Sequence, residues 1–147
     1  MNIELILKGC ALAHLGLVVA GLLMPRAVGL RGHLAALPVF IRRLFWVYYT
    51  FIGLCLVSFG LGTFVLAPEL AAGTALARAV CAFLTVFWTL RWVVAIAVFD
   101  LRPYLTTVWH RAGLLAANTV FAILPVVYGY LAWRTPVPAN PGSHLNF

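Results

Sequence analysis

The sequence predicts an all-α fold, namely an integral membrane protein built as a compact bundle of four transmembrane helices, N-out/C-out. Three observations support this prediction. First, 65% of the 147 residues are hydrophobic and only 9% are charged, whereas a soluble domain has about 25% charged residues. Second, four apolar segments have the roughly 20 residues that are needed to cross about 30 Å of hydrocarbon. Third, arginines gather in alternate connections between these segments.

The four apolar segments make up one predicted transmembrane domain, residues 1–133. We expect the spans at about residues 3–24, 44–67, 79–99 and 112–133. The first segment differs from a cleaved signal peptide, because its apolar run is long, Glu4 precedes Lys8, and no A-x-A site follows it. We therefore expect it to stay as the first helix.

Two segments lie outside the predicted spans. Residues 25–43 mix arginines with leucines, a composition typical of a short amphipathic helix at the membrane interface, and we expect Pro38 to end that helix. Residues 134–147 contain three prolines and a glycine without a core-forming pattern. They are therefore expected to form an extended, Pro-rich extramembrane tail.

The distribution of basic residues predicts the orientation. Six arginines lie in the first and third connections, against three basic residues on the other side. The positive-inside rule then places the two basic connections in the cytoplasm of a multi-pass cell-membrane protein. At the start of the second span, "RRLFWVYY" puts two arginines before Trp46 and Tyr49, the order typical of a headgroup boundary followed by an aromatic belt.

The same basic residues indicate which anionic molecules the protein contacts. The chain carries a formal net charge of +7, but its arginines flank apolar spans, so membrane lipids with anionic headgroups are expected and nucleic acid is not. Cys10, Cys55 and Cys81 all lie in apolar segments without C-x-x-C spacing. They are interpreted as buried packing residues, and no metal site is predicted.

Polar residues inside the predicted spans are the candidate site. Arg91 lies near the middle of the third predicted span, where an arginine costs about 2.5–3.5 kcal/mol to insert, so it should face the bundle interior or a polar cavity. No carboxylate is expected at that depth, which leaves local polar groups, another subunit or a bound ligand to satisfy it. The candidate ligand or subunit contacts are Arg91, His14, Trp88, Trp92 and Asn118.

His14 raises the question of a cofactor. Haem in membrane bundles takes axial histidines from facing helices, but His110 is expected about 15 Å away in depth. A pair of histidine ligands from one chain is therefore disfavoured, while a single ligand or two copies of His14 in a homodimer remain open. The cofactor is thus unknown: a quinone, a lipid or a haem is compatible with the sequence, and none is required.

Two further groups of residues are predicted. The first is a cytoplasmic polar cluster of Asp100, Arg102, Tyr104, His110 and Arg111. The alternative interpretation is that these residues form a solvated turn. A small-residue face on the first helix, which would allow another helix to approach closely, consists of Gly9, Ala13, Gly16 and Ala20.

Three functions are compatible with these features. The favoured one is a non-catalytic structural or accessory subunit of a larger membrane complex. The sequence has only three carboxylates, none of them paired with another, for acid–base catalysis. It also has no nucleotide-binding, metalloprotease or nucleophile-elbow motif. The partners of such a subunit would be other membrane subunits or a second copy. The alternatives are a membrane-embedded binding or redox module near Arg91 and His14, and a stand-alone lipid-modifying enzyme or small permease.

Overall fold

The computed structural model describes residues 2–98 and 108–134, and all of its regular structure is helical. The helices are α1 (Ile3–Ala27), α2 (Leu30–Ala35), α3 (Val39–Val65), α4 (Ala67–Ala72), α5 (Ala75–Ala97) and α6 (Val108–Trp133). Four of them, α1, α3, α5 and α6, are long and apolar enough to cross a membrane. The predicted all-α, four-helix membrane fold is thereby confirmed, while the N-out/C-out orientation stays a prediction.

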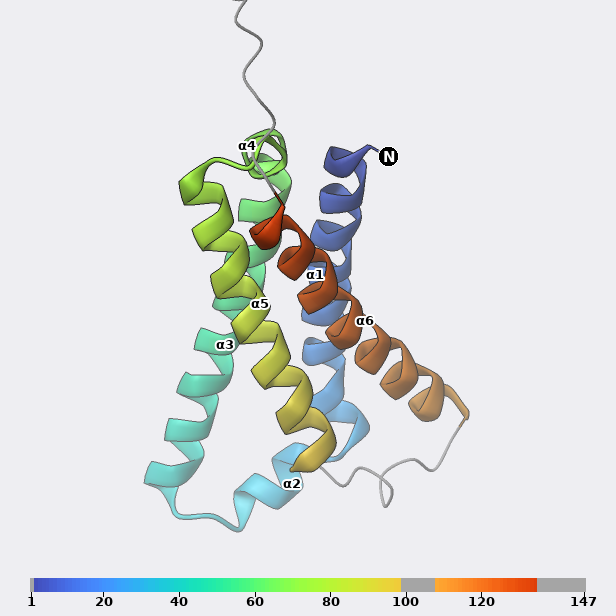
Figure 1. The fold of residues 1–147 in the computed structure, drawn as a ribbon. Coiled ribbons are helices and arrows are strands. Elements are labelled where there is room, and N and C mark those ends of the chain that lie inside the picture. The colour runs from blue at the N-terminus through green and yellow to red at the C-terminus, as the bar shows by residue number, and fades with distance from the viewer. Residues whose placement is uncertain (1, 99–107, 135–147) are drawn as a thin grey trace, which may run out of the picture.

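The four long helices alternate in direction, and α6 is tilted so that its first turns lie away from the other helices (Figure 1). The most extensive contacts join α5 to α6 and α1 to α3. We call the end of the bundle that carries α4 the α4 end, and the N-terminus and the last turn of α6 lie there as well (Figure 1). The opposite end, with the short helix α2, is the α2 end.

Short-range interactions decide where several helices begin and end. The side chains of Asn2 and Thr74 accept hydrogen bonds from the backbone N–H groups of Leu5 and Ala77, capping the N-termini of α1 and α5. Gly29 has a φ of 60°, a left-handed conformation that glycine adopts without steric cost. This turn lets the chain fold back from the end of α1 into α2.

The helices are longer than the predicted spans. Helix α1 continues past Pro25 to Ala27, and α3 begins at Val39 rather than at residue 44. Hydropathy marks only the part within the hydrocarbon, whereas a helix continues beyond it because its backbone groups remain paired. The expected short helix in residues 25–43 is α2, but Pro38 is the N-cap of α3 and does not end α2, which stops at Ala35. Its location at the interface remains a prediction.

The buried core is concentrated towards the α4 end. Its members come from residues 7–17 of α1, from α4, from residues 77–88 of α5 and from the second half of α6. They are Leu7, Cys10, Leu17, Ala67, Leu70, Ala77, Cys81, Leu84, Trp88, Leu124, Tyr128 and Leu131. In contrast, Leu34 alone is buried among residues 20–50, which form the α2 end of α1, α2 and the start of α3. The two ends of the bundle therefore differ in packing.

Candidate functional site

Four helices contribute a polar or aromatic side chain to one buried group, the interior polar cluster of His14, Thr63, Trp88 and Tyr128. All four residues are at most 2% exposed. The His14 ring meets the edge of the Trp88 ring at 5.1 Å and that of Tyr128 at 6.2 Å, centroid to centroid. The hydroxyls of Thr63 and Tyr128 are 2.8 Å apart and hydrogen-bonded. This cluster links α1, α3, α5 and α6 inside the bundle.

A glycine on α3 makes room for His14. A Cβ added at Gly60 would lie 2.9 Å from the His14 Cβ and 3.5 Å from the Ala11 carbonyl oxygen. Real Cβ atoms essentially never approach as closely as the first distance. Gly60 is therefore the place where α1 and α3 cross closely, as small residues allow in membrane helices.

The hydrogen bonds of His14 define its chemistry. Its Nδ1–H donates to the Cys10 carbonyl oxygen at 2.7 Å, since a carbonyl can only accept. In this tautomer Nε2 carries no proton and has a lone pair that can accept a hydrogen bond. Nε2 is buried and has no hydrogen-bond partner among residues 2–98 and 108–134, and the same is true of Nε1 of Trp88. A haem iron would bind at Nε2, but the aromatic rings of Trp88 and Tyr128 would first have to move apart. The packing thus favours a structural role for His14.

Arg91 lies one turn beyond Trp88 on α5, towards the α2 end. Its guanidinium carbon is 5.0 Å from the centroid of the Phe121 ring, a cation–π distance. The same Phe121 ring also stacks on the Trp88 ring, with the two centroids 5.7 Å apart. Phe121 was not among the predicted contacts.

The remaining candidate contacts, Trp92 and Asn118, lie on α5 and α6. Trp92 is partly exposed on α5, and Asn118 is partly exposed on α6, one turn before Phe121. The structure therefore brings Arg91, Trp88 and His14 into one neighbourhood through the two rings of Trp88 and Phe121.

The predicted cytoplasmic polar cluster lies mostly outside the described residues. This applies to Asp100, Arg102 and Tyr104 and to the side chain of His110. Arg111 is described and is exposed in the second turn of α6. The predicted tail, residues 135–147, is outside the described part as well.

The small-residue face of α1 does not pack against any other part of residues 2–98 and 108–134. Gly9, Gly16 and Ala20 are exposed and Ala13 is partly exposed. No described atom lies within 4 Å of a Cβ added at Gly9 or Gly16. Helix α1 meets α3 through the opposite side, where Gly60 supplies the small residue, so the predicted approach of another helix to the small-residue face stays a prediction. Cys55, interpreted as a buried packing residue, is likewise exposed.

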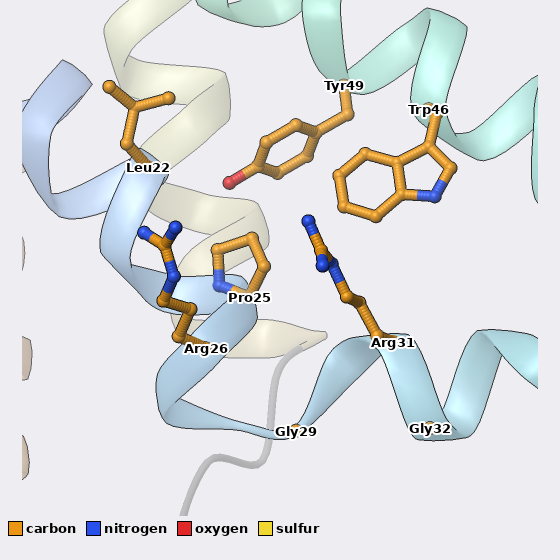
Figure 2. A pocket seen from close by; sticks show the side chains of 8 residues that line it. All are labelled: Leu22, Pro25, Arg26, Gly29, Arg31, Gly32, Trp46 and Tyr49. Carbon is orange, nitrogen blue, oxygen red and sulfur yellow. The ribbon is translucent and has the colours of Figure 1, made fainter.

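A second candidate site, at the α2 end, was not predicted as a unit. A cavity of about 590 Å³, the arginine pocket, lies between the end of α1, α2 and the start of α3 (Figure 2). It is lined by Leu22, Pro25, Arg26, Gly29, Arg31, Gly32, Trp46 and Tyr49. The sequence did show the arginines and the aromatic belt, but only the turn at Gly29 brings them around one cavity.

Comparison with known proteins adds no relative: no protein-family model, curated protein or solved structure matches the chain. The arguments on function therefore depend on the residues and their geometry.

Proposed function

We propose that the chain is a non-catalytic structural or accessory subunit of a larger membrane complex, and that a partner helix packs on the small-residue face of α1. The observation that supports this proposal is the division of α1 into two sides. One side, with Leu7, His14 and Leu17, is buried in the bundle. The other side carries Gly9 and Gly16, each without a described neighbour within 4 Å of an added Cβ.

The shape of the open side suits a second helix. Leu5 and Leu12 are exposed and stand four residues before and three residues after Gly9, so they are its neighbours on the helix surface. They form a ridge beside the groove over the glycines. In lipid, helices associate mainly through such close packing, because lipid tails are as apolar as leucine side chains. The partner is therefore a membrane helix of another subunit or of a second copy.

The interior of the bundle supports the non-catalytic part of the proposal. Two hydrogen bonds at its centre, Thr63–Tyr128 and His14–Cys10, stay within the described chain, although Nε2 of His14 and Nε1 of Trp88 have no described partner. His14, Thr63 and Tyr128 are at most 2% exposed, so a substrate would have to displace core rings to reach them. A redox module, a lipid-modifying enzyme or a permease would need such access, and these alternatives are less well supported.

The test is purification of the tagged full-length protein in mild detergent, with mass spectrometry of every protein that co-elutes. Wild type is expected to elute with a stoichiometric partner or as a defined oligomer, and Gly16→Leu is expected to elute without it because the leucine fills the groove. Gly113→Leu is the matched control, since Gly113 also has no described neighbour within 4 Å of an added Cβ but lies on α6. A wild-type protein that elutes as a lone monomer, or a Gly16→Leu variant that keeps its partner, contradicts the proposal.

A further inference from the structure

We infer that the arginine pocket at the α2 end binds a phosphate group, and that its ligand is the headgroup of an anionic lipid. The inference does not depend on the proposed subunit role, because it concerns the opposite end of the molecule and different residues. It is built from the charges, the aromatic wall and the apolar mouth of the pocket.

The charges in the pocket lack a described acidic partner. Arg26, in the last turn of α1, and Arg31, in α2, lie on either side of Pro25, with Arg26 extending towards Leu22 and Arg31 towards the rings of Tyr49 and Trp46 (Figure 2). The two carboxylates that the structure describes, Glu4 and Glu69, belong to the first turns of α1 and α4. Glu4 is separated from Arg26 by about 33 Å of helix at 1.5 Å per residue. A phosphate can therefore be the counter-charge, and guanidinium groups bind it with paired hydrogen bonds.

A rigid aromatic wall faces the arginines. The rings of Trp46 and Tyr49 pack edge to face with centroids 5.7 Å apart. The Tyr49 hydroxyl donates to the Gly21 carbonyl oxygen of α1, which holds the wall against the neighbouring helix. Tryptophan and tyrosine are the residues that occupy the headgroup level of a bilayer. The pocket is thus expected at the depth of the lipid phosphates.

The cavity continues beyond Arg31. An adjoining cavity of about 400 Å³ is lined by Arg31, Leu34, Arg42 and Trp46, so it shares Arg31 and Trp46 with the arginine pocket. Three arginines therefore surround the joined space. Each of the two volumes falls in the range of about 300–1,000 Å³ that small-molecule sites have.

The lining favours a lipid over a free phosphate ion. Beside its arginines the pocket has Leu22, which is exposed on the lipid-facing part of α1, together with Pro25 and the Trp46 ring. An anionic lipid would place its phosphate against the arginines of the pocket and its glycerol and acyl chains along Leu22. A free phosphate would leave this apolar side unused.

The experiment is native mass spectrometry of the purified full-length protein in detergent, with equimolar phosphatidylglycerol and phosphatidylcholine of identical acyl chains. Wild type is expected to carry mainly phosphatidylglycerol. Arg31→Gln is expected to lower this preference about fivefold, the effect of one basic residue near anionic lipid. Arg43→Gln removes the same charge from an exposed position on α3 that lines neither cavity, and it should keep the wild-type preference.

Two results would overturn the inference. One is the absence of any preference in wild type. The other is an equal loss in Arg31→Gln and Arg43→Gln, which would show that general surface charge attracts the lipid. If Arg31→Gln fails to fold, Arg31→Lys serves in its place: it keeps the charge but loses the planar fork, so a partial loss is expected, and an unchanged preference contradicts the site.

A further arm separates the two sources of phosphate. Excess inorganic phosphate added to the wild-type sample is expected to leave the phosphatidylglycerol adduct in place. Displacement of the lipid by phosphate would assign the pocket to a soluble phosphate compound and would overturn the lipid assignment.

Discussion

The α4 and α2 ends of the bundle are built from the same kinds of helices but differ in packing. At the α4 end the core residues of four helices are buried against one another. There Nε–H of Arg78 on α5 also donates a hydrogen bond to the Ala132 carbonyl oxygen of α6 at 2.9 Å. At the α2 end only Leu34 is buried among residues 20–50, and two cavities lined by arginines are open. The comparison indicates that one half of the molecule holds the helices together while the other half presents charge, so stability and ligand binding can change separately.

The largest expected effect is that of Trp88→Ala at the centre of the packed half. Trp88 is fully buried and contacts His14, Phe87 and Phe121, so truncation leaves a large cavity. The cost in free energy of unfolding should be about 3 kcal/mol, the lower end of the range for buried aromatics, because lipid still contacts the ring in the unfolded state.

Denaturation of the reconstituted protein by sodium dodecyl sulfate measures this cost. Trp109→Ala is the matched control, since Trp109 is 85% exposed at the start of α6, and it should change the stability little. Similar effects of the two substitutions would show that the packed half does not dominate the stability.

Gly60→Ala is expected to have the next largest effect. The new Cβ would lie 2.9 Å from the His14 Cβ, and neither atom can move without a shift of its helix. The substitution should destabilise the protein by about 1–3 kcal/mol, as overpacking does. Gly62→Ala on the same helix meets no described atom within 4 Å, and it should be neutral or stabilising by up to about 1 kcal/mol. The same denaturation assay compares them, and a neutral Gly60→Ala would refute the close α1–α3 crossing.

The smallest effect is expected from Tyr49→Phe at the open end. The change removes the hydrogen bond from the Tyr49 hydroxyl to the Gly21 carbonyl oxygen, which in membrane proteins contributes about 0.6 kcal/mol on average. Global stability should hardly change, whereas amide hydrogen exchange in the last turns of α1 should become faster. Tyr48→Phe, at an exposed neighbouring position, should leave that exchange as in wild type. A global loss as large as that of Gly60→Ala would contradict the division into a packed and an open half.

The prediction from sequence succeeded for properties that each segment carries by itself. Four apolar segments of sufficient length led to four long helices, and the leucine- and arginine-rich connection contained the short helix α2. It did not decide what the small-residue face contacts, because Gly9 and Gly16 have the same spacing whether they face a helix of this chain, another subunit or lipid. Gly60 is a small residue of the same kind, and the structure decides that it makes the close contact between α1 and α3.

The sequence alone determined the environment of this protein, its helix number and its basic and apolar segments, because these follow from local composition and length. Tertiary structure alone decided which sides of the helices meet. In lipid an apolar side is stable both inside and outside a bundle, so hydrophobicity does not distinguish the two. The contact of Thr63 with Tyr128, 65 residues apart, and the gathering of Arg26, Arg31 and Trp46 around one pocket therefore depend on shape and packing across the whole chain.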